Sequence, residues 1–133
     1  MNIIVCVDDK GGLSFNRRRQ SRDRVLNEKL LALSAGSKLW MAPSSEKLFA
    51  GAPQVCVTED FLEQAEAEDF CFVEQAVLAP YLDKIDHLYL VRWNRVYPAD
   101  SWLDLDLTAW QLASTEEFPG SSHEKITLEV YKR

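Results

Sequence analysis

The chain has 133 residues, of which 47% are apolar and 27% are charged, and its formal net charge is −6. This length suits one domain with a buried core, and the composition excludes wholesale disorder. The acidic balance argues against a general nucleic-acid binder, because such domains are normally basic. No run of 18 apolar residues predicts a membrane-spanning helix. No basic region precedes the first apolar run, so a signal peptide is not expected and the cytoplasm is the predicted location.

The cysteines and histidines do not form a recognisable metal or disulfide pattern. Cys6, Cys56 and Cys71 each lie within an apolar run. Their odd number and the lack of C-x-x-C spacing argue against a disulfide framework and a zinc site. The two histidines, His87 and His123, lack the spacings of a metal-dependent hydrolase. We therefore expect buried thiols in a reducing compartment and no metal.

Short apolar runs alternate with helical patterns over the first 93 residues. Asn2–Val7 is a continuous apolar run closed by glycines, which is typical of a buried strand. Ser21 is placed as the N-cap of the first helix, and Gly36 as the residue after its end. The expected strands are 2–7, 38–42, 54–57, 70–73 and 87–93. The expected helices are 22–35, 44–51, 59–66 and 75–85, and the last is expected to be broken or to begin at Pro80.

The pattern changes after residue 94. Two longer runs, 110–118 and 125–131, are joined by the turn residues 119–122, which predicts an antiparallel hairpin with one solvated face. Strands that alternate with helices predict a mainly parallel sheet covered by helices on both faces. The predicted fold class is α/β, with the hairpin at one edge of the sheet and a single domain over 1–133.

An arginine cluster follows the first strand. Five arginines fall within residues 17–24, directly before the first helix. Guanidinium groups match the geometry of phosphate and carboxylate, and a helix N-terminus also favours anions. Arg17, Arg18 and Arg22 are therefore candidate ligand-binding residues. The alternative is a solvated loop whose arginines pair with some of the 21 Asp and Glu residues.

Two tryptophans are candidates for lining a pocket. Trp40 and Trp93 fall at the ends of expected strands, where an α/β sheet normally opens its ligand crevice. The alternative is that both belong to the core. A Ser/His/acid triad around Ser121, Ser122 and His123 is not expected, because no Gly-x-Ser-x-Gly motif is present and a hairpin turn accounts for these residues.

This order of elements resembles dihydrofolate reductase. The similarity is carried by residues 2–12, which resemble the family's first strand and glycine-containing loop, and by 79–90 and 122–133, which resemble its later strands. Asp23 lies near the helix start where the family keeps its substrate-binding acid, so the resemblance makes it a candidate catalytic residue. Sliding the helix to align Leu30 and Leu31 places Asn27 there instead. Asp23 could equally be a helix N-terminal charge without a ligand.

The sequence departs from this family where the family holds NADPH. The family has a Gly-Arg-x-Thr segment after the second strand, and this chain has Ala42–Ser45. The family has paired glycines after the fourth strand, and this chain has Val73–Gln75, in which the Glu74 carboxylate would repel a phosphate. We therefore expect that NADPH is not bound in the usual way, and the cofactor, if any, is unknown.

Three functions remain open. The first is a divergent member that binds a small anionic or heterocyclic ligand beside Arg22 and Asp23. The second is a reductase of a pterin-like substrate that holds NADPH through altered contacts. The third is an interaction module that works through a homodimer surface on the terminal hairpin. Neither nucleic acid nor a membrane is an expected partner.

Overall fold

A seven-stranded sheet runs through the centre of the molecule. The computed structural model describes all residues, 1–133. The strands of this sheet are β1 (Asn2–Val7), β4 (Leu39–Met41), β5 (Val55–Val57), β6 (Phe70–Val73), β7 (His87–Arg92), β9 (Gln111–Phe118) and β10 (Ile126–Lys132). Their spatial order is β5-β4-β6-β1-β7-β10-β9.

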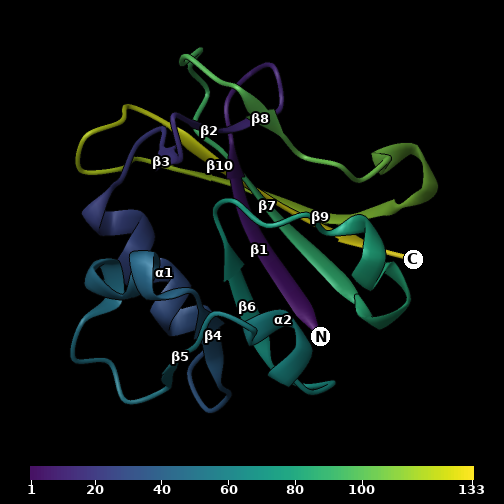
Figure 1. The fold of residues 1–133 in the computed structure, drawn as a ribbon. Coiled ribbons are helices and arrows are strands. Elements are labelled where there is room, and N and C mark those ends of the chain that lie inside the picture. Colours follow the sequence, from purple (N-terminus) through teal and green to yellow (C-terminus); the bar gives the residue numbers. More distant parts are fainter.

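The central strands are parallel, as the sequence predicts. β1 pairs with β6 on one side and with β7 on the other, both in parallel register, and Figure 1 shows β1 between them. β1 and β6 consist of apolar runs without alternation, because helices cover both faces of the sheet at this position. The predicted α/β class with a mainly parallel sheet is confirmed.

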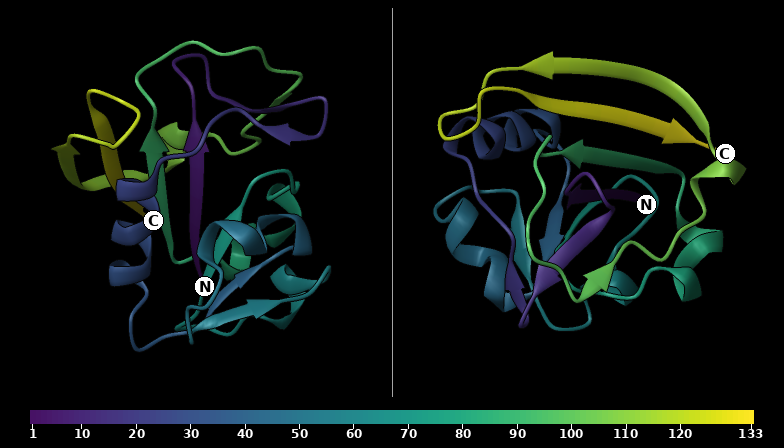
Figure 2. Two further views of the ribbon diagram at one scale, coloured as in Figure 1. Left: turned by 90° about the vertical axis from the view of Figure 1, so that its left-hand side faces the viewer. Right: turned by 90° about the horizontal axis from the view of Figure 1, so that it is seen from above.

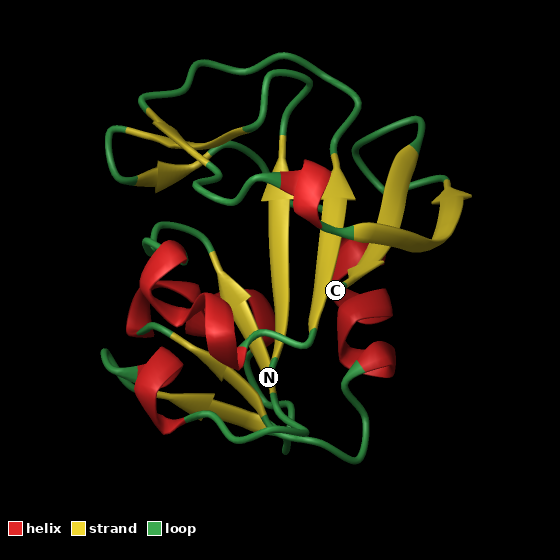
Figure 3. Cartoon of the chain, turned by 90° about the vertical axis from the view of Figure 1, so that its right-hand side faces the viewer, coloured by secondary structure: helices red, strands yellow, loops and turns green.

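Helices lie on both sides of the sheet (Figure 3). The helix α1 (Arg24–Leu33) and the 3-10 helix η1 (Pro43–Phe49) pack on one face through Leu26, Leu30 and Phe49. The helix α2 (Phe61–Gln64) and the 3-10 helix η2 (Ala79–Lys84) cover the other face, and a short 3-10 helix, η3 (Leu107–Ala109), follows later in the chain. No helix is both long and apolar enough to cross a membrane.

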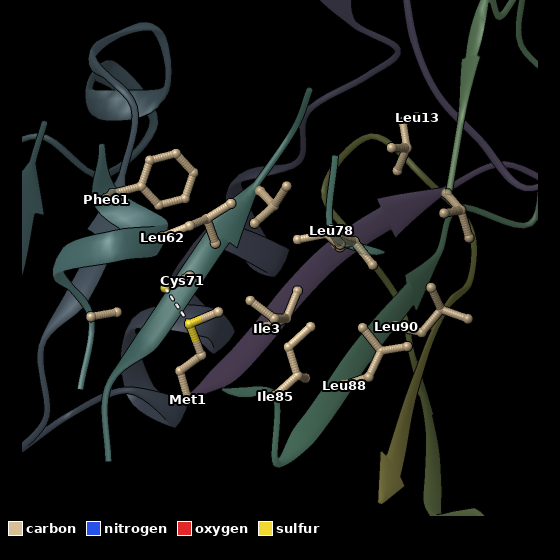
Figure 4. Packing of buried hydrophobic residues seen from close by; sticks show 14 of the residues in the cluster. Met1, Ile3, Leu13, Phe61, Leu62, Cys71, Leu78, Ile85, Leu88 and Leu90 are labelled. Carbon is tan, nitrogen blue, oxygen red and sulfur yellow. Dashed lines mark hydrogen bonds between the residues drawn. The ribbon is translucent and has the colours of Figure 1, made fainter. Parts of the chain in front are cut away.

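The core on the α2 side extends to the first residue of the chain. Figure 4 shows side chains from β1, β6, β7 and α2 meeting in this layer. Met1 is buried there, with its sulfur 3.9 Å from the Cys71 sulfur. The amino group of Met1 donates to the Lys84 carbonyl at 2.6 Å and to the Asp86 carboxylate at 2.9 Å. Burial raises the pKa of the Cys71 thiol to about 12, so this thiol is unreactive.

Three of the predicted helices are shorter than the sequence indicated. The first begins at Arg24 with Asp23, not Ser21, as its N-cap, because the Asp23 carboxylate accepts the Leu26 N–H. The helix expected over 59–66 covers only Phe61–Gln64. The helix expected over 75–85 reduces to a 3-10 turn over Ala79–Lys84, since Pro80 lies at its start.

A small second sheet was not predicted. It consists of β2 (Gly12–Phe15), β3 (Arg18–Arg19) and β8 (Ser101–Trp102), in the order β3-β2-β8. Asn16 and Arg17 connect β2 to β3 with φ values of 50° and 60°, the left-handed pair that a two-residue hairpin turn requires. Figure 1 shows this sheet beyond the carboxyl end of β1, where it carries the arginine cluster.

The predicted terminal hairpin is present and forms one edge of the large sheet. β10 pairs antiparallel with both β7 and β9. Figure 2 shows β9 and β10 as a long curved ribbon at this edge. β9 is exposed from Gln111 to Glu117, so it is solvated on both faces rather than on one.

Candidate anion-binding site

The arginine cluster borders an open groove of about 650 Å³. The groove lies between the β2–β3 hairpin, the start of α1 and η1. No Asp or Glu is among the residues that line it, although the chain as a whole is acidic. We call it the arginine groove, and its lining residues are Arg17, Arg18, Arg19, Ser21, Arg22, Ser44, Lys47 and Gln75.

Most cations of the arginine groove have no acidic partner. Of the five arginines in 17–24, Arg19 pairs with Glu74 and Arg24 pairs with Glu28. Arg17, Arg18 and Arg22 are exposed, and their guanidinium groups form neither a hydrogen bond nor an ion pair within the chain. Of the pairing expected for a solvated loop, the structure shows two cases, Arg19 and Arg24, and the other three arginines face solvent. The groove presents unneutralised positive charge.

Arg19 locks the hairpin onto the main sheet. Its Nε and Nη2 donate to the Glu74 carboxylate at 2.7 and 3.0 Å, and Nη2 also donates to the Ser44 carbonyl at 2.8 Å. The Ser45 hydroxyl donates to the same carboxylate at 2.6 Å. The Gln75 amide donates to the Arg17 carbonyl. We call the contacts among Arg19, Glu74 and Ser45 the Arg19–Glu74 lock.

This lock joins the two segments in which the sequence departs from the resembling family. Ser44 and Ser45 follow β4, and Glu74 follows β6. Beside the lock remains a narrow, partly open pocket with room for about one water. The residues around this pocket include Cys6, Gln20, Ser21, Asn27 and Trp93. Side chains of the protein therefore fill most of the crevice at the carboxyl ends of β1 and β6.

Asp23 is buried and its carboxylate is fully occupied. It accepts the N–H groups of Leu26 at 3.1 Å, Ser121 at 3.0 Å and Ser122 at 2.9 Å. His123 Nδ1 lies 3.0 Å from Oδ2. Burial alone would raise the pKa of Asp23, but the hydrogen bonds from Ser122, His123, Ser121 and Leu26 outweigh it and hold the pKa well below its usual value. Asp23 is therefore an ionised anchor between α1 and the 120s loop.

Gly120 allows this loop to approach Asp23. A Cβ at Gly120 would collide with the Asp23 carboxylate. The Gly120 N–H donates to the His123 carbonyl at 3.0 Å, which closes the turn around the carboxylate. The turn that the sequence predicts at 119–122 thus has a second role, since it delivers two N–H groups to an acid about 100 residues away.

His123 lies in the core of this arrangement. It is 4% exposed, and its ring stacks on Trp93 with 4.6 Å between the centroids. Its Nε2 lies 3.1 Å from the Ser21 hydroxyl and 3.0 Å from the Tyr97 hydroxyl. Both nitrogens of the imidazole therefore have polar partners.

The structure brings together most of the predicted site residues. Arg17, Arg18 and Arg22 line the arginine groove, and Trp93 and Asn27 border the narrow pocket. Arg22, Asp23 and Asn27 also line a second open groove of about 480 Å³ between α1 and η1.

Trp40 is not part of this group. It packs against the core on the α2 side of the sheet, and its indole N–H donates to the Asp69 carboxylate at 2.9 Å. Trp40 ends a strand in sequence, but its side chain lies on the other face of the sheet from α1. A residue's position at the end of a strand in the sequence does not show on which face of the sheet its side chain lies.

Several residues of the site were not identified from sequence. Lys47 completes the arginine groove from η1, and Tyr97 and His123 complete the cluster at Asp23. No local pattern could have found His123, because its partner Asp23 is 100 positions away. No cluster of three or more His, Cys, Asp or Glu side chains is arranged to hold a metal ion.

Comparison with known proteins is informative about the fold. No model of a protein family matches the chain, and no curated protein matches it. Among solved structures, dihydrofolate reductase from Enterococcus faecalis, complexed with NADP(H) and RAB-propyl, is similar with a TM-score of 0.71. The match covers 99% of this chain and 95% of that chain, at 12% sequence identity. The chain therefore has a divergent dihydrofolate reductase-like fold, as its sequence predicted.

Proposed function

We propose that this protein binds a small anionic ligand in the arginine groove and does not hold NADPH in the usual way of its fold. The observation that carries the proposal is the unpaired state of Arg17, Arg18 and Arg22 around a groove without acids. Exposed cations this close together repel one another, and a bound anion would relieve that repulsion. Lys47 adds a further positive charge from η1.

The chemistry of the groove suits phosphate or carboxylate groups. A guanidinium group presents several N–H donors in a plane, and charge-assisted hydrogen bonds of this kind are about twice as strong as neutral ones. Three such groups together favour a ligand with more than one anionic oxygen centre, such as a diphosphate. The groove contains no aromatic residue on which a base or a pterin could stack.

The Arg19–Glu74 lock supports the second half of the proposal. A phosphate group placed after β6 would meet the Glu74 carboxylate, which is already bonded to Arg19 and Ser45. Binding would have to break these bonds and bring two negative charges together. The pocket that remains beside the lock has room for about one water.

The hydrogen bonds that Asp23 already accepts favour an anionic ligand over a heterocyclic one. A carboxylate that holds a pterin needs free acceptor sites toward the ligand, and the oxygens of Asp23 already accept from Leu26, Ser121, Ser122 and His123. We therefore assign Asp23 to positioning the site rather than to direct contact with a ligand. Asn27 borders the narrow pocket and keeps its side-chain amide near the Leu48 carbonyl, at 3.5 Å.

Calorimetric titration with inorganic pyrophosphate tests the proposal. We expect saturable binding to the wild type, and Arg22→Ala should weaken it by about ten-fold, because a hydrogen-bonded charge contact contributes 1.5–3 kcal/mol. Arg24→Ala is the matched control, since Arg24 belongs to the same cluster but pairs with Glu28 and does not line the groove. Equal weakening by both variants, or no binding by the wild type, would contradict a specific site.

An interaction module remains the second candidate because of β9. This strand lies at the edge of the sheet, and its residues Gln111–Glu117 are exposed. An open edge strand can pair with the same strand of a second copy across a two-fold axis. The elution volume of the wild type, compared with that of Ser114→Pro, tests this candidate. Identical monomeric volumes would rule out a dimer through β9.

A further inference from the structure

Ser21, His123 and Asp23 form a hydrogen-bonded relay. The Ser21 hydroxyl lies 3.1 Å from His123 Nε2, and His123 Nδ1 lies 3.0 Å from the Asp23 carboxylate. These are the distances at which a histidine removes a proton from a hydroxyl nucleophile while an acid holds the ring in place. A relay of this kind is recognised by geometry and by the role of each group, not by sequence position.

The surroundings determine which nitrogen of His123 carries the proton. The ionised Asp23 carboxylate can only accept, so the proton lies on Nδ1 and Nε2 presents its lone pair. Two N–H groups, from Ser121 and Ser122, hold the carboxylate, and Trp93 stacks on the imidazole ring. The acid and the base are therefore both fixed, and Nε2 is an acceptor directed at hydroxyl groups.

Ser21 lies where a ligand and a water could both reach it. It is half-buried, lines the arginine groove and also borders the narrow pocket beside the lock. Gln20 borders the same pocket, and its Oε1 is buried without a hydrogen-bond partner. The backbone N–H groups of Ser21 and Arg22 donate no hydrogen bond within the chain, so they are free to stabilise a developing oxyanion.

We propose that Ser21 is a nucleophile, activated by His123, for the hydrolysis of a small ester or thioester that carries a phosphate or carboxylate group. The substrate class rests on the proposed function, because the arginine groove would hold the anionic group. Asp23 positions the imidazole and does not contact the substrate.

The reaction is a two-step acyl transfer. Ser21 Oγ attacks the carbonyl carbon and its proton passes to His123 Nε2. The bond to the alcohol or thiol then breaks, and the leaving group takes that proton. In the second step a water attacks the acyl-serine, gives its proton to Nε2, and releases the acid as Ser21 regains its hydrogen. Atoms and charges balance without a cofactor.

The Tyr97 hydroxyl offers a way to distinguish a nucleophilic Ser21 from a Ser21 that only forms a structural hydrogen bond. Its hydroxyl lies 3.0 Å from the same Nε2, which has a single lone pair. Only one of the two hydroxyl groups can donate at a time, so Tyr97 competes with Ser21 for the base. Removing the Tyr97 hydroxyl should therefore increase the reactivity of Ser21, whereas the loss of a purely structural hydrogen bond would not.

Labelling with a fluorophosphonate, followed by intact-protein mass spectrometry, tests the proposal. We expect one adduct per chain on the wild type, none on Ser21→Ala, and faster labelling of Tyr97→Phe than of the wild type. Ser37→Ala is the control, since Ser37 is a half-buried serine beyond the far end of α1, and it should label normally. No adduct on the wild type, or an adduct that survives in Ser21→Ala, would overturn the proposal, as would a Tyr97→Phe variant that folds but does not label.

A second measurement separates this proposal from the anion site itself. Pyrophosphate titration of the wild type reports on the arginine groove alone, because pyrophosphate has no carbonyl carbon that Ser21 could attack. If the wild type binds pyrophosphate but is not labelled by the fluorophosphonate, the anion site is supported and the assignment of Ser21 as a nucleophile is refuted. Mono-p-nitrophenyl succinate should be hydrolysed with a kcat/KM at least about ten-fold above that of p-nitrophenyl acetate, since its carboxylate adds a charge-assisted contact. Equal values for the two esters would refute the anionic substrate class.

Discussion

Arg17 holds a backbone conformation that arginine rarely adopts. Its φ of 60° lies in the left-handed region, where a side chain costs about 1–2 kcal/mol relative to glycine. The Asn16–Arg17 turn would be more stable as Asn-Gly, the preferred pair for a two-residue hairpin. Strain of this kind concentrates at functional sites, and here it places a guanidinium group on the arginine groove.

Replacing Arg17 by glycine should raise stability while it weakens ligand binding. Arg17→Gly should raise the free energy of unfolding by about 1 kcal/mol, because it relieves the left-handed strain, and should weaken pyrophosphate binding. Arg18→Gly removes the same charge from the β3 strand and should lower stability by about 0.5–1 kcal/mol. Denaturant unfolding of both variants measures the difference. The same sign of effect in the two variants would contradict the role assigned to the turn.

Asp23 and Asp8 should make the fold sensitive to acid. Burial alone would raise the pKa of Asp8, but N–H groups of Tyr97, Gly12 and Lys10 hold it below its usual value, as the loop contacts do for Asp23. A carboxyl whose pKa is lowered by folding stabilises the protein above its unfolded pKa, near 3.8. That stabilisation is lost as the pH falls through the folded pKa. Stability should therefore decline below about pH 4.

The variant Asp23→Asn tests this directly. It should lower the free energy of unfolding at pH 7 by about 3 kcal/mol, because the asparagine amide cannot replace the hydrogen bonds that the buried carboxylate accepts. Its stability should also depend less on pH between pH 5 and pH 2 than that of the wild type. Parallel pH profiles for the two proteins would show that Asp23 does not contribute the acid sensitivity.

At the scale of elements, the β2–β3 hairpin is attached to the sheet by the Arg19–Glu74 lock. The side chains of Arg19 and Glu74 are 20% and 12% exposed, so water screens their interaction only partly. Glu74→Gln should cost about 2 kcal/mol, as expected for hydrogen bonds to a charged group. Glu117→Gln, which removes the exposed 3.7 Å pair with Lys125, should cost less than about 0.5 kcal/mol.

Hydrogen exchange gives a readout specific to the hairpin. Breaking the lock should accelerate amide exchange in residues 12–19 of Glu74→Gln and leave β6 and β1 protected, because the lock is one of the side-chain attachments of the hairpin to the main sheet. Uniform acceleration over the whole chain would mean that Glu74 supports global stability instead.

The elements that sequence predicted well are those decided by burial. β1 and β6 have the predicted bounds because continuous apolar runs of this length form buried strands. β3 was missed, since Arg18–Arg19 has no apolar pattern and pairs only through its backbone. Asp23 was recognised as a candidate, but its role as N-cap and loop anchor depends on residues 121–123, which only the folded chain brings near.

At the scale of the whole molecule, the fold is dihydrofolate reductase-like, and we propose that its ligand surface differs. The sheet order and the terminal hairpin place the chain among dihydrofolate reductase-like structures. Glu74, Ser45 and Arg19 are bonded to one another after β4 and β6, and the neighbouring Arg17, Arg18 and Arg22 face solvent. The proposed binding surface is therefore the arginine groove rather than the region of the Arg19–Glu74 lock.

A thermal unfolding titration of the wild type with pyrophosphate and with NADPH, run in parallel, tests this account most directly. A ligand that binds only the folded state raises the unfolding temperature in a saturable manner. We predict saturable stabilisation by pyrophosphate, and no stabilisation by NADPH beyond what its phosphates achieve through Arg22. Saturable stabilisation by NADPH that persists in Arg22→Ala would contradict the account and would make a reductase with altered cofactor contacts the leading function.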